Sequence, residues 1–160
     1  MSSHTLTDAD FDRMSWHDNH VHGLRIVGAE VADHFVLKSG ELVLDLDYIV
    51  EWVNLSEERL QFRIQPSTLR FLEVSSLRIV IDYSTPQSLL WPFSIHGIEC
   101  AVVPRERYEA RLWTIRLSSP EGAITFEADG FEQTGWGKIV ESAEQCLLPS
   151  ERVPLESGDV

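Results

Sequence analysis

The clearest pattern in this chain of 160 residues is the stretch Glu41-Leu42-Val43-Leu44-Asp45-Leu46-Asp47-Tyr48-Ile49-Val50-Glu51-Trp52. Successive side chains of a β-strand point to opposite faces, so a period of two predicts a long strand here. One face is acidic at its start, and the other is apolar throughout, with Leu42, Leu44, Leu46, Tyr48, Val50 and Trp52. A helix would scatter the same apolar residues around its circumference. We therefore expect the fold to be built around this strand.

Shorter runs on both sides of this stretch repeat its alternation. They cover residues 20–27, 35–37, 60–64, 69–71, 77–83, 91–103, 108–117 and 124–128. Turn residues separate most of these runs, and Pro66 is expected to end the run that begins at Leu60. About eight to ten short strands with almost no helix predict an all-β fold, either an antiparallel β-sandwich or a half-open barrel.

The length and the position of the strands predict one domain, over residues 1–148. Within it, residues 1–15 are expected to be a loose lead-in with at most a helical turn at 9–14. Residues 138–148 could hold one short C-terminal helix. Residues 149–160 are charged and contain Pro154 and Gly158, so we expect a flexible acidic tail.

Charge excludes some classes of partner. The chain has 13 Lys and Arg residues against 26 Asp and Glu residues, a formal net charge of −13. This field repels phosphate backbones and anionic membrane surfaces, so neither nucleic acid nor membrane is expected as a partner, whereas a basic protein would be attracted. We find no bilayer-spanning stretch and no signal peptide. With two isolated cysteines, Cys100 and Cys146, these observations predict a cytoplasmic protein.

Three of the six histidines lie in the stretch Trp16-His17-Asp18-Asn19-His20-Val21-His22. In a strand, His20 and His22 would point the same way, on the face of Leu24 and Ile26, unless Gly23 carries a bulge. Two imidazoles at this spacing can bind a divalent metal ion such as Zn, Ni, Mn or Fe. The predicted metal ligands are His17, Asp18, His20 and His22. A facing strand could add one further acid, Asp45 or Asp47.

A structural role explains the same residues equally simply. Trp16 would anchor the core, His17 and Asp18 would hydrogen-bond the turn, and His20 and His22 would be half-buried with backbone partners. Cupins share the His20-Val21-His22 spacing but place a glutamate four or five positions later, where this chain has Ile26 or Val27. Amidohydrolases share the spacing too, on a far longer barrel. Neither comparison supports an assignment.

A second resemblance concerns the Trp16-His17-Asp18 triplet and the following run His22-Gly23-Leu24-Arg25-Ile26. This pattern resembles several small bacterial families of unknown function, some of which are grouped with immunity proteins of polymorphic toxin systems. Later stretches are similar in character, namely Thr68-Leu69-Arg70-Phe71, Ser76-Leu77-Arg78-Ile79 and Ile124-Thr125-Phe126-Glu127-Ala128-Asp129-Gly130-Phe131. The resemblance implies a small β-rich cytoplasmic protein that has no catalytic residues and, in the immunity branch, binds a partner protein.

Two functions remain as hypotheses. The first is a non-enzymatic, immunity-like protein-binding module, in which Glu41, Asp45 and Asp47 contact a basic protein. These acids could equally form a solvated strand face. The second is a metal-binding protein or metal-dependent enzyme centred on residues 17–22. The chain contains no nucleophile elbow, P-loop or dinucleotide fingerprint, so an enzyme is the less favoured interpretation. Long alternating strands would also suit a homodimer formed by edge strands.

Overall fold

The protein is all-β, as the alternation predicts. The computed structural model describes residues 5–156. It contains two short 3-10 helices, η1 (Asp8–Arg13) and η2 (Pro149–Glu151). The strands are β1 (Leu6–Thr7), β2 (His20–Val27), β3 (Glu30–Ala32), β4 (Phe35–Lys38), β5 (Glu41–Ser56), β6 (Arg59–Leu72), β7 (Ser75–Ile81), β8 (Phe93–Pro104), β9 (Glu109–Ser119), β10 (Gly122–Glu127), β11 (Gly130–Gly135) and β12 (Val140–Ser142).

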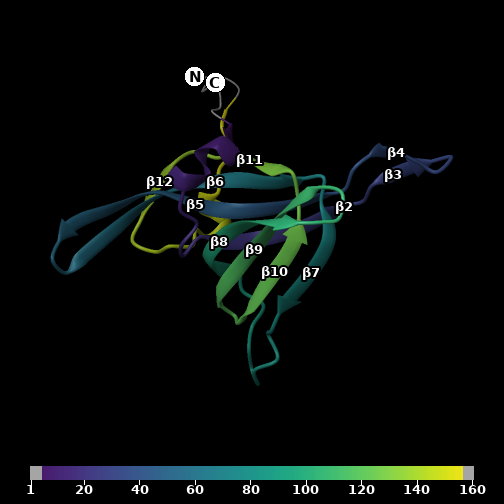
Figure 1. The fold of residues 1–160 in the computed structure, drawn as a ribbon. Coiled ribbons are helices and arrows are strands. Elements are labelled where there is room, and N and C mark those ends of the chain that lie inside the picture. Colours follow the sequence, from purple (N-terminus) through teal and green to yellow (C-terminus); the bar gives the residue numbers. More distant parts are fainter. Residues whose placement is uncertain (1–4, 157–160) are drawn as a thin grey trace.

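One antiparallel sheet of ten strands forms the body of the molecule. Its order is β1-β11-β6-β5-β2-β8-β9-β10-β7, with β12 beside β6. Figure 1 shows β5, β6 and β11 in one layer and β7 to β10 in another. Strand β2 joins the layers, because it pairs with β5 along most of its length and with β8 only at His20 and Val21. Among the described residues, the edge strands β1 and β7 do not pair with each other, so the sheet folds over without closing.

The core lies between the two layers and is rich in aromatic rings. The ring centroid of Phe71 on β6 lies 4.6 Å from that of Phe126 and 5.3 Å from that of Trp113. These rings meet edge to face, the arrangement that aromatic quadrupoles favour. The predicted apolar face of β5 contributes its first three leucines, all fully buried, namely Leu42, Leu44 and Leu46.

The apolar face of β5 does not continue to Trp52, and that part of the prediction is wrong. The pairing with β6 shifts register between Ile49 and Glu51, which leaves Val50 as an extra residue. An extra residue moves every later side chain to the opposite face. Val50 and Trp52 are consequently exposed to 43%. Ile49 is instead buried, in a second small cluster with Phe62, Ile64 and Leu147.

Pro66 does not end its strand, contrary to expectation. Strand β6 continues through it to Leu72, and the Pro66 carbonyl accepts backbone hydrogen bonds from Trp136 and Gly137. These residues lie between β11 and β12, the two strands that flank β6 on that side. A residue's N–H and C=O point to the same side of an antiparallel strand. The missing N–H of proline therefore falls in the gap between two partner strands, where no ladder bond is lost.

Both ends of the described chain are more ordered than expected. Near the start, β1 pairs with β11 and η1 occupies the position of the predicted helical turn. Near the end, residues 138–148 contain β12 rather than a helix. Residues 149–156 are fixed to the body, since Pro154 bridges to Gly137 and Leu155 donates to the Trp136 carbonyl. The last part of the predicted tail, 157–160, lies outside the described residues.

Removal of one core ring should be costly. We expect Phe71→Ala to lower the free energy of unfolding by about 3–5 kcal/mol, because the substitution would leave a cavity and remove the contacts of the Phe71 ring with three surrounding rings. Phe35→Ala is the matched control. Phe35 is 73% exposed, so the same truncation there should cost less than about 0.5 kcal/mol. Urea unfolding measures both values, and equal losses would contradict this assignment of the core.

Candidate metal centre and adjoining cavity

A β-bulge in β2 sets the direction of His22. Val21 pairs with Leu46 and Gly23 pairs with Asp45, so His22 has no partner on β5. A bulge redirects the side chain of its extra residue. Val21 enters the core and Leu24 packs against it, whereas His20 and His22 line a cavity outside it. The expected common face of His20, His22, Leu24 and Ile26 is therefore not formed, because the bulge changes the alternation at Gly23.

His22 meets a buried carboxylate, Asp47 on β5. Its Nε2 lies 2.8 Å from Asp47 Oδ2. The same oxygen accepts the Leu147 backbone N–H at 2.8 Å, and Oδ1 accepts Arg152 Nε at 2.9 Å. Burial alone would raise the pKa of Asp47, but the hydrogen bonds from His22, Leu147 and Arg152 outweigh it and hold the pKa below its ordinary value. Asp47 is therefore an anion without any exposed surface.

Arg152 joins this carboxylate to a second one. Its guanidinium donates to both oxygens of Asp45, at 2.8 and 2.9 Å, and lies 5.1 Å from the centre of the Trp136 ring. Trp136 Nε1 also donates to Asp45, at 3.2 Å. Burial alone would lower the pKa of Arg152, and its bonds to Asp45 and Asp47 raise it overall. With one guanidinium and two carboxylates, the group has one net negative charge.

Residues 143–156, here called the C-terminal strap, cover the outer face of β5 at this point. The strap is held by Arg152, by the Leu147 backbone N–H on Asp47 and by the Leu147 side chain, which packs in the second core cluster. Before the strap begins, the chain passes close to β6 at Gly137, where a Cβ would lie 2.7 Å from the Pro66 ring. The strap thus converts an outward-facing acidic position into a buried one.

The strap brings Cys146 to the histidine. Cys146 Sγ lies 3.8 Å from His22 Nε2, and the donor atoms of His22, Asp47 and Cys146 all lie within 4.8 Å of one another. Burial, with a smaller contribution from the Asp47 charge, raises the pKa of the Cys146 thiol to about 11, so the thiol is protonated at neutral pH.

The three side chains are not arranged as a nucleophilic triad. In such a triad the acid binds one ring nitrogen of histidine while the nucleophile faces the other. Here Asp47 and Cys146 both approach the same nitrogen, Nε2 of His22. A protonated thiol is also a weak nucleophile. The three ligand-type atoms lie close enough together that they could hold a metal ion instead.

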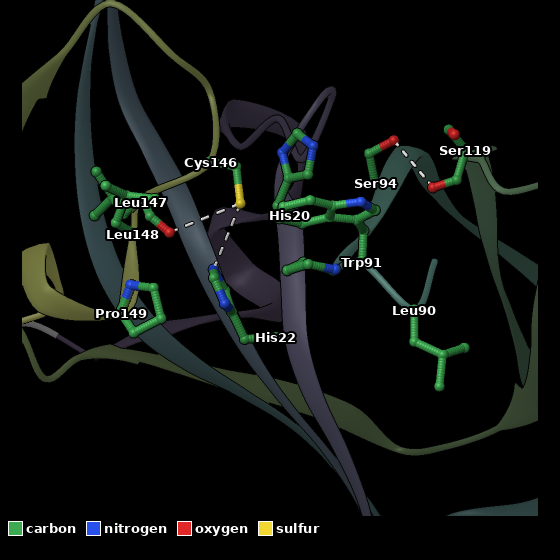
Figure 2. Close-up of a pocket in the computed structure, with 11 residues that line it drawn as sticks. His20, His22, Leu90, Trp91, Ser94, Ser119, Cys146, Leu147, Leu148 and Pro149 are labelled. Carbon is green, nitrogen blue, oxygen red and sulfur yellow. Dashed lines mark hydrogen bonds between the residues drawn. The ribbon is translucent and has the colours of Figure 1, made fainter. Parts of the chain in front are cut away.

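A cavity of about 570 Å³ adjoins this group. Figure 2 shows Cys146 and His22 between two walls, with the strap residues Leu147, Leu148 and Pro149 on one side and the loop before β8 on the other. The cavity is lined by His20, His22, Leu90, Trp91, Pro92, Ser94, Ser119, Cys146, Leu147, Leu148 and Pro149. Clefts of this size with mostly apolar walls and a few polar groups are typical small-molecule sites.

Of the four predicted ligands, the structure places only His22 in the cluster. His17 Nδ1 lies 3.0 Å from the His96 carbonyl oxygen, and Asp18 accepts a hydrogen bond from Gln145. These contacts go to β8 and to the C-terminal segment, and neither residue contributes an atom to the cluster. His20 lines the cavity, its Nδ1 is buried without a hydrogen-bond partner, and burial lowers its pKa.

The three acids predicted to bind a partner protein are either buried or already paired with other side chains. Asp47 is buried, so it offers no surface to a partner protein. Asp45 is held by Arg152 and Trp136, and Glu41 pairs with Arg70 at 2.8 Å. The expectation that Asp45 or Asp47 would supply an acid to the histidines is met by Asp47. A binding role for Glu41 and Asp45 stays a prediction.

Sequence reasoning missed Cys146 and Arg152. Cys146 lies 124 residues from His22, and Arg152 lies 105 residues from Asp47. Neither forms a motif with a neighbouring residue, and both fall in segments expected to be helical or loose. No local signal in the sequence could have linked them to the histidine stretch.

Comparisons with protein families, with curated proteins and with solved structures gave no match to this chain. Among residues 5–156, no helix has the length and apolar character needed to cross a membrane. The functional argument therefore rests on the geometry above.

Loss of the Asp47 charge should destabilise the fold. We expect Asp47→Asn to lower the free energy of unfolding by about 3 kcal/mol at pH 7, because Arg152 would lose one partner in a buried network. The pKa of Asp47 is depressed in the folded state. Its stabilisation is therefore full above the pKa of an unfolded aspartate, about 3.9, and is lost as the pH falls through the lower folded pKa.

The difference in stability between wild type and Asp47→Asn should consequently shrink below about pH 4. Glu51→Gln serves as the control, since Glu51 and Arg63 form an exposed ion pair that should contribute less than about 1 kcal/mol. Urea unfolding at a series of pH values gives both differences. A pH-independent gap, or an equal loss in the control, would contradict the assignment.

Proposed function

We propose that this protein binds a divalent transition-metal ion, preferentially Zn²⁺, through His22, Asp47 and Cys146. The main observation in support is that one imidazole, one carboxylate and one thiol place their donor atoms within 4.8 Å of one another. Nitrogen and sulfur ligands favour Zn²⁺ over Mn²⁺ or Mg²⁺, which prefer oxygen.

The charge of the surroundings supports this proposal. Asp45, Asp47 and Arg152 leave one net negative charge beside a neutral thiol. Binding of a divalent cation with release of the Cys146 proton would bring the group to neutrality. The ion would thereby overcome the raised pKa of the thiol, since a coordinated thiol is deprotonated.

The fixed position of the Asp47 carboxylate also supports the proposal. The Leu147 N–H and the Arg152 guanidinium hold Asp47 in place, and such outer contacts increase metal affinity. Three protein ligands also leave a fourth position for a tetrahedral ion. Because His22 and Cys146 line the cavity, an ion bound by them would adjoin it.

Titration of metal-free protein with Zn²⁺ and Co²⁺ tests this function. We expect one ion per chain and, with Co²⁺, a thiolate-to-cobalt charge-transfer band. His22→Gln and Cys146→Ser should each weaken binding by at least about 100-fold, because each removes a direct ligand and loss of an outer contact alone costs 10–100-fold.

His96→Gln and Cys100→Ser are the matched controls, since they alter the same residue types outside the cluster. Both should bind the ion as the wild type does. Failure to bind one ion, or equal affinity in the ligand and control variants, would overturn the proposed function.

Protein binding is the second candidate, and a separate feature favours it. Strands β3 and β4 pair only with each other among the described strands, and Figure 1 shows them extending away from the sheet. Every residue of this hairpin, here called the β3–β4 arm, is exposed. Its apolar members are Val31, Ala32, Phe35, Val36 and Leu37. A lone two-stranded hairpin is only marginally stable in water, so a partner surface would stabilise the arm.

A net charge of −13 favours a basic partner over a second copy of the chain. This is the immunity-like role that the resemblance implies. The test is affinity capture with wild type, with Phe35→Ser/Leu37→Ser, and with Leu55→Ser/Leu60→Ser as the control. Leu55 and Leu60 are exposed residues of the hairpin that joins β5 to β6. A basic protein bound by wild type and control, lost in the arm variant and weakened by salt, is expected. Equal capture by all three proteins would contradict the role of the arm.

A further inference from the structure

We propose that the cavity beside the metal centre binds a small molecule with a metal-binding donor at one end and a flat apolar group at the other. This inference rests on the proposed metal function and adds the class of ligand. The occupant would reach His22 and Cys146 with its polar end and contact Trp91 with its apolar end.

The apolar walls of the cavity support this proposal. Trp91 is 68% exposed and Leu90 is 84% exposed, although both line the cavity. Large side chains of this kind are normally covered, and an apolar surface that borders a cleft marks a binding site. Opposite them, Leu147, Leu148 and Pro149 of the C-terminal strap supply a second apolar wall (Figure 2).

The loop that carries Trp91 is held in this position. The Tyr83 hydroxyl donates to the Trp91 carbonyl oxygen, and the Trp91 N–H donates to the Leu89 carbonyl at 3.0 Å. These contacts fix the backbone of the loop outside the core, so the indole remains available at the cavity. A flat indole face favours an aromatic or similarly flat ligand group, since stacked rings gain more than contact area alone.

The polar residues of the cavity also support the proposal. His22 and Cys146 lie there, and His20 beside them has a buried Nδ1 without a hydrogen-bond partner. Buried polar groups normally have partners, so a ligand donor or acceptor would complete this one. Ser94, by contrast, already bonds the Ser118 hydroxyl at 2.7 Å. The unsatisfied polar capacity of the cavity thus lies with His20 rather than with Ser94.

Hydroxamates provide suitable probes, because acetohydroxamate and benzohydroxamate share one metal-binding head and differ in the flat ring. With Co²⁺-loaded protein, we expect both to shift the visible cobalt spectrum. Benzohydroxamate should bind about tenfold more tightly, since its ring would contact Trp91. Trp91→Ala should abolish this preference without weakening acetohydroxamate. Tyr108→Ala, which removes another exposed aromatic residue outside the cavity, should retain it.

The spectrum separates two kinds of failure. A missing thiolate-to-cobalt band would overturn the proposed metal function, and this inference with it. A normal band with equal affinity for the two hydroxamates, or an unchanged preference in Trp91→Ala, would overturn the inference alone. Thermal unfolding of both variants should match wild type, because both side chains are largely exposed.

Discussion

The buried carboxylate of Asp47 is the constraint on which the rest of the site depends. An isolated charge in a protein interior costs several kcal/mol, so it persists only with close hydrogen-bonding partners. These partners come from two distant parts of the chain, His22 on β2 and the C-terminal strap with Leu147 and Arg152. The strap therefore has to close over β5 for the sheet to keep this anion.

Closure of the strap creates the candidate site as a consequence. The same contacts that satisfy Asp47 bring Cys146 to His22 and form one wall of the cavity. The group keeps one negative charge while the Cys146 thiol is protonated, and a divalent ion that displaced the thiol proton would make it neutral. The proposed metal centre would thus use the same three side chains as the structural network, with the thiol proton displaced by the ion.

The two candidate functions occupy different parts of the molecule. The candidate metal centre and its cavity lie where β2, β5 and the strap meet, whereas the β3–β4 arm extends away from the sheet (Figure 1). The arm forms no strand pairing with the other described strands. A partner protein on the arm would therefore leave the cavity free, and the two functions are compatible within one chain.

The sequence alone determined the all-β fold and most strand positions, because a period of two is a local property of the chain. Only the tertiary structure decided the site. The bulges at His22 and Val50 change which face each later residue occupies; Gly23 allows the first without fixing it, and no residue beside Val50 indicates the second. Cys146 reaches His22 across 124 residues, through a strap whose path depends on buried Asp47. Such contacts depend on packing and burial, which act between segments rather than along the sequence.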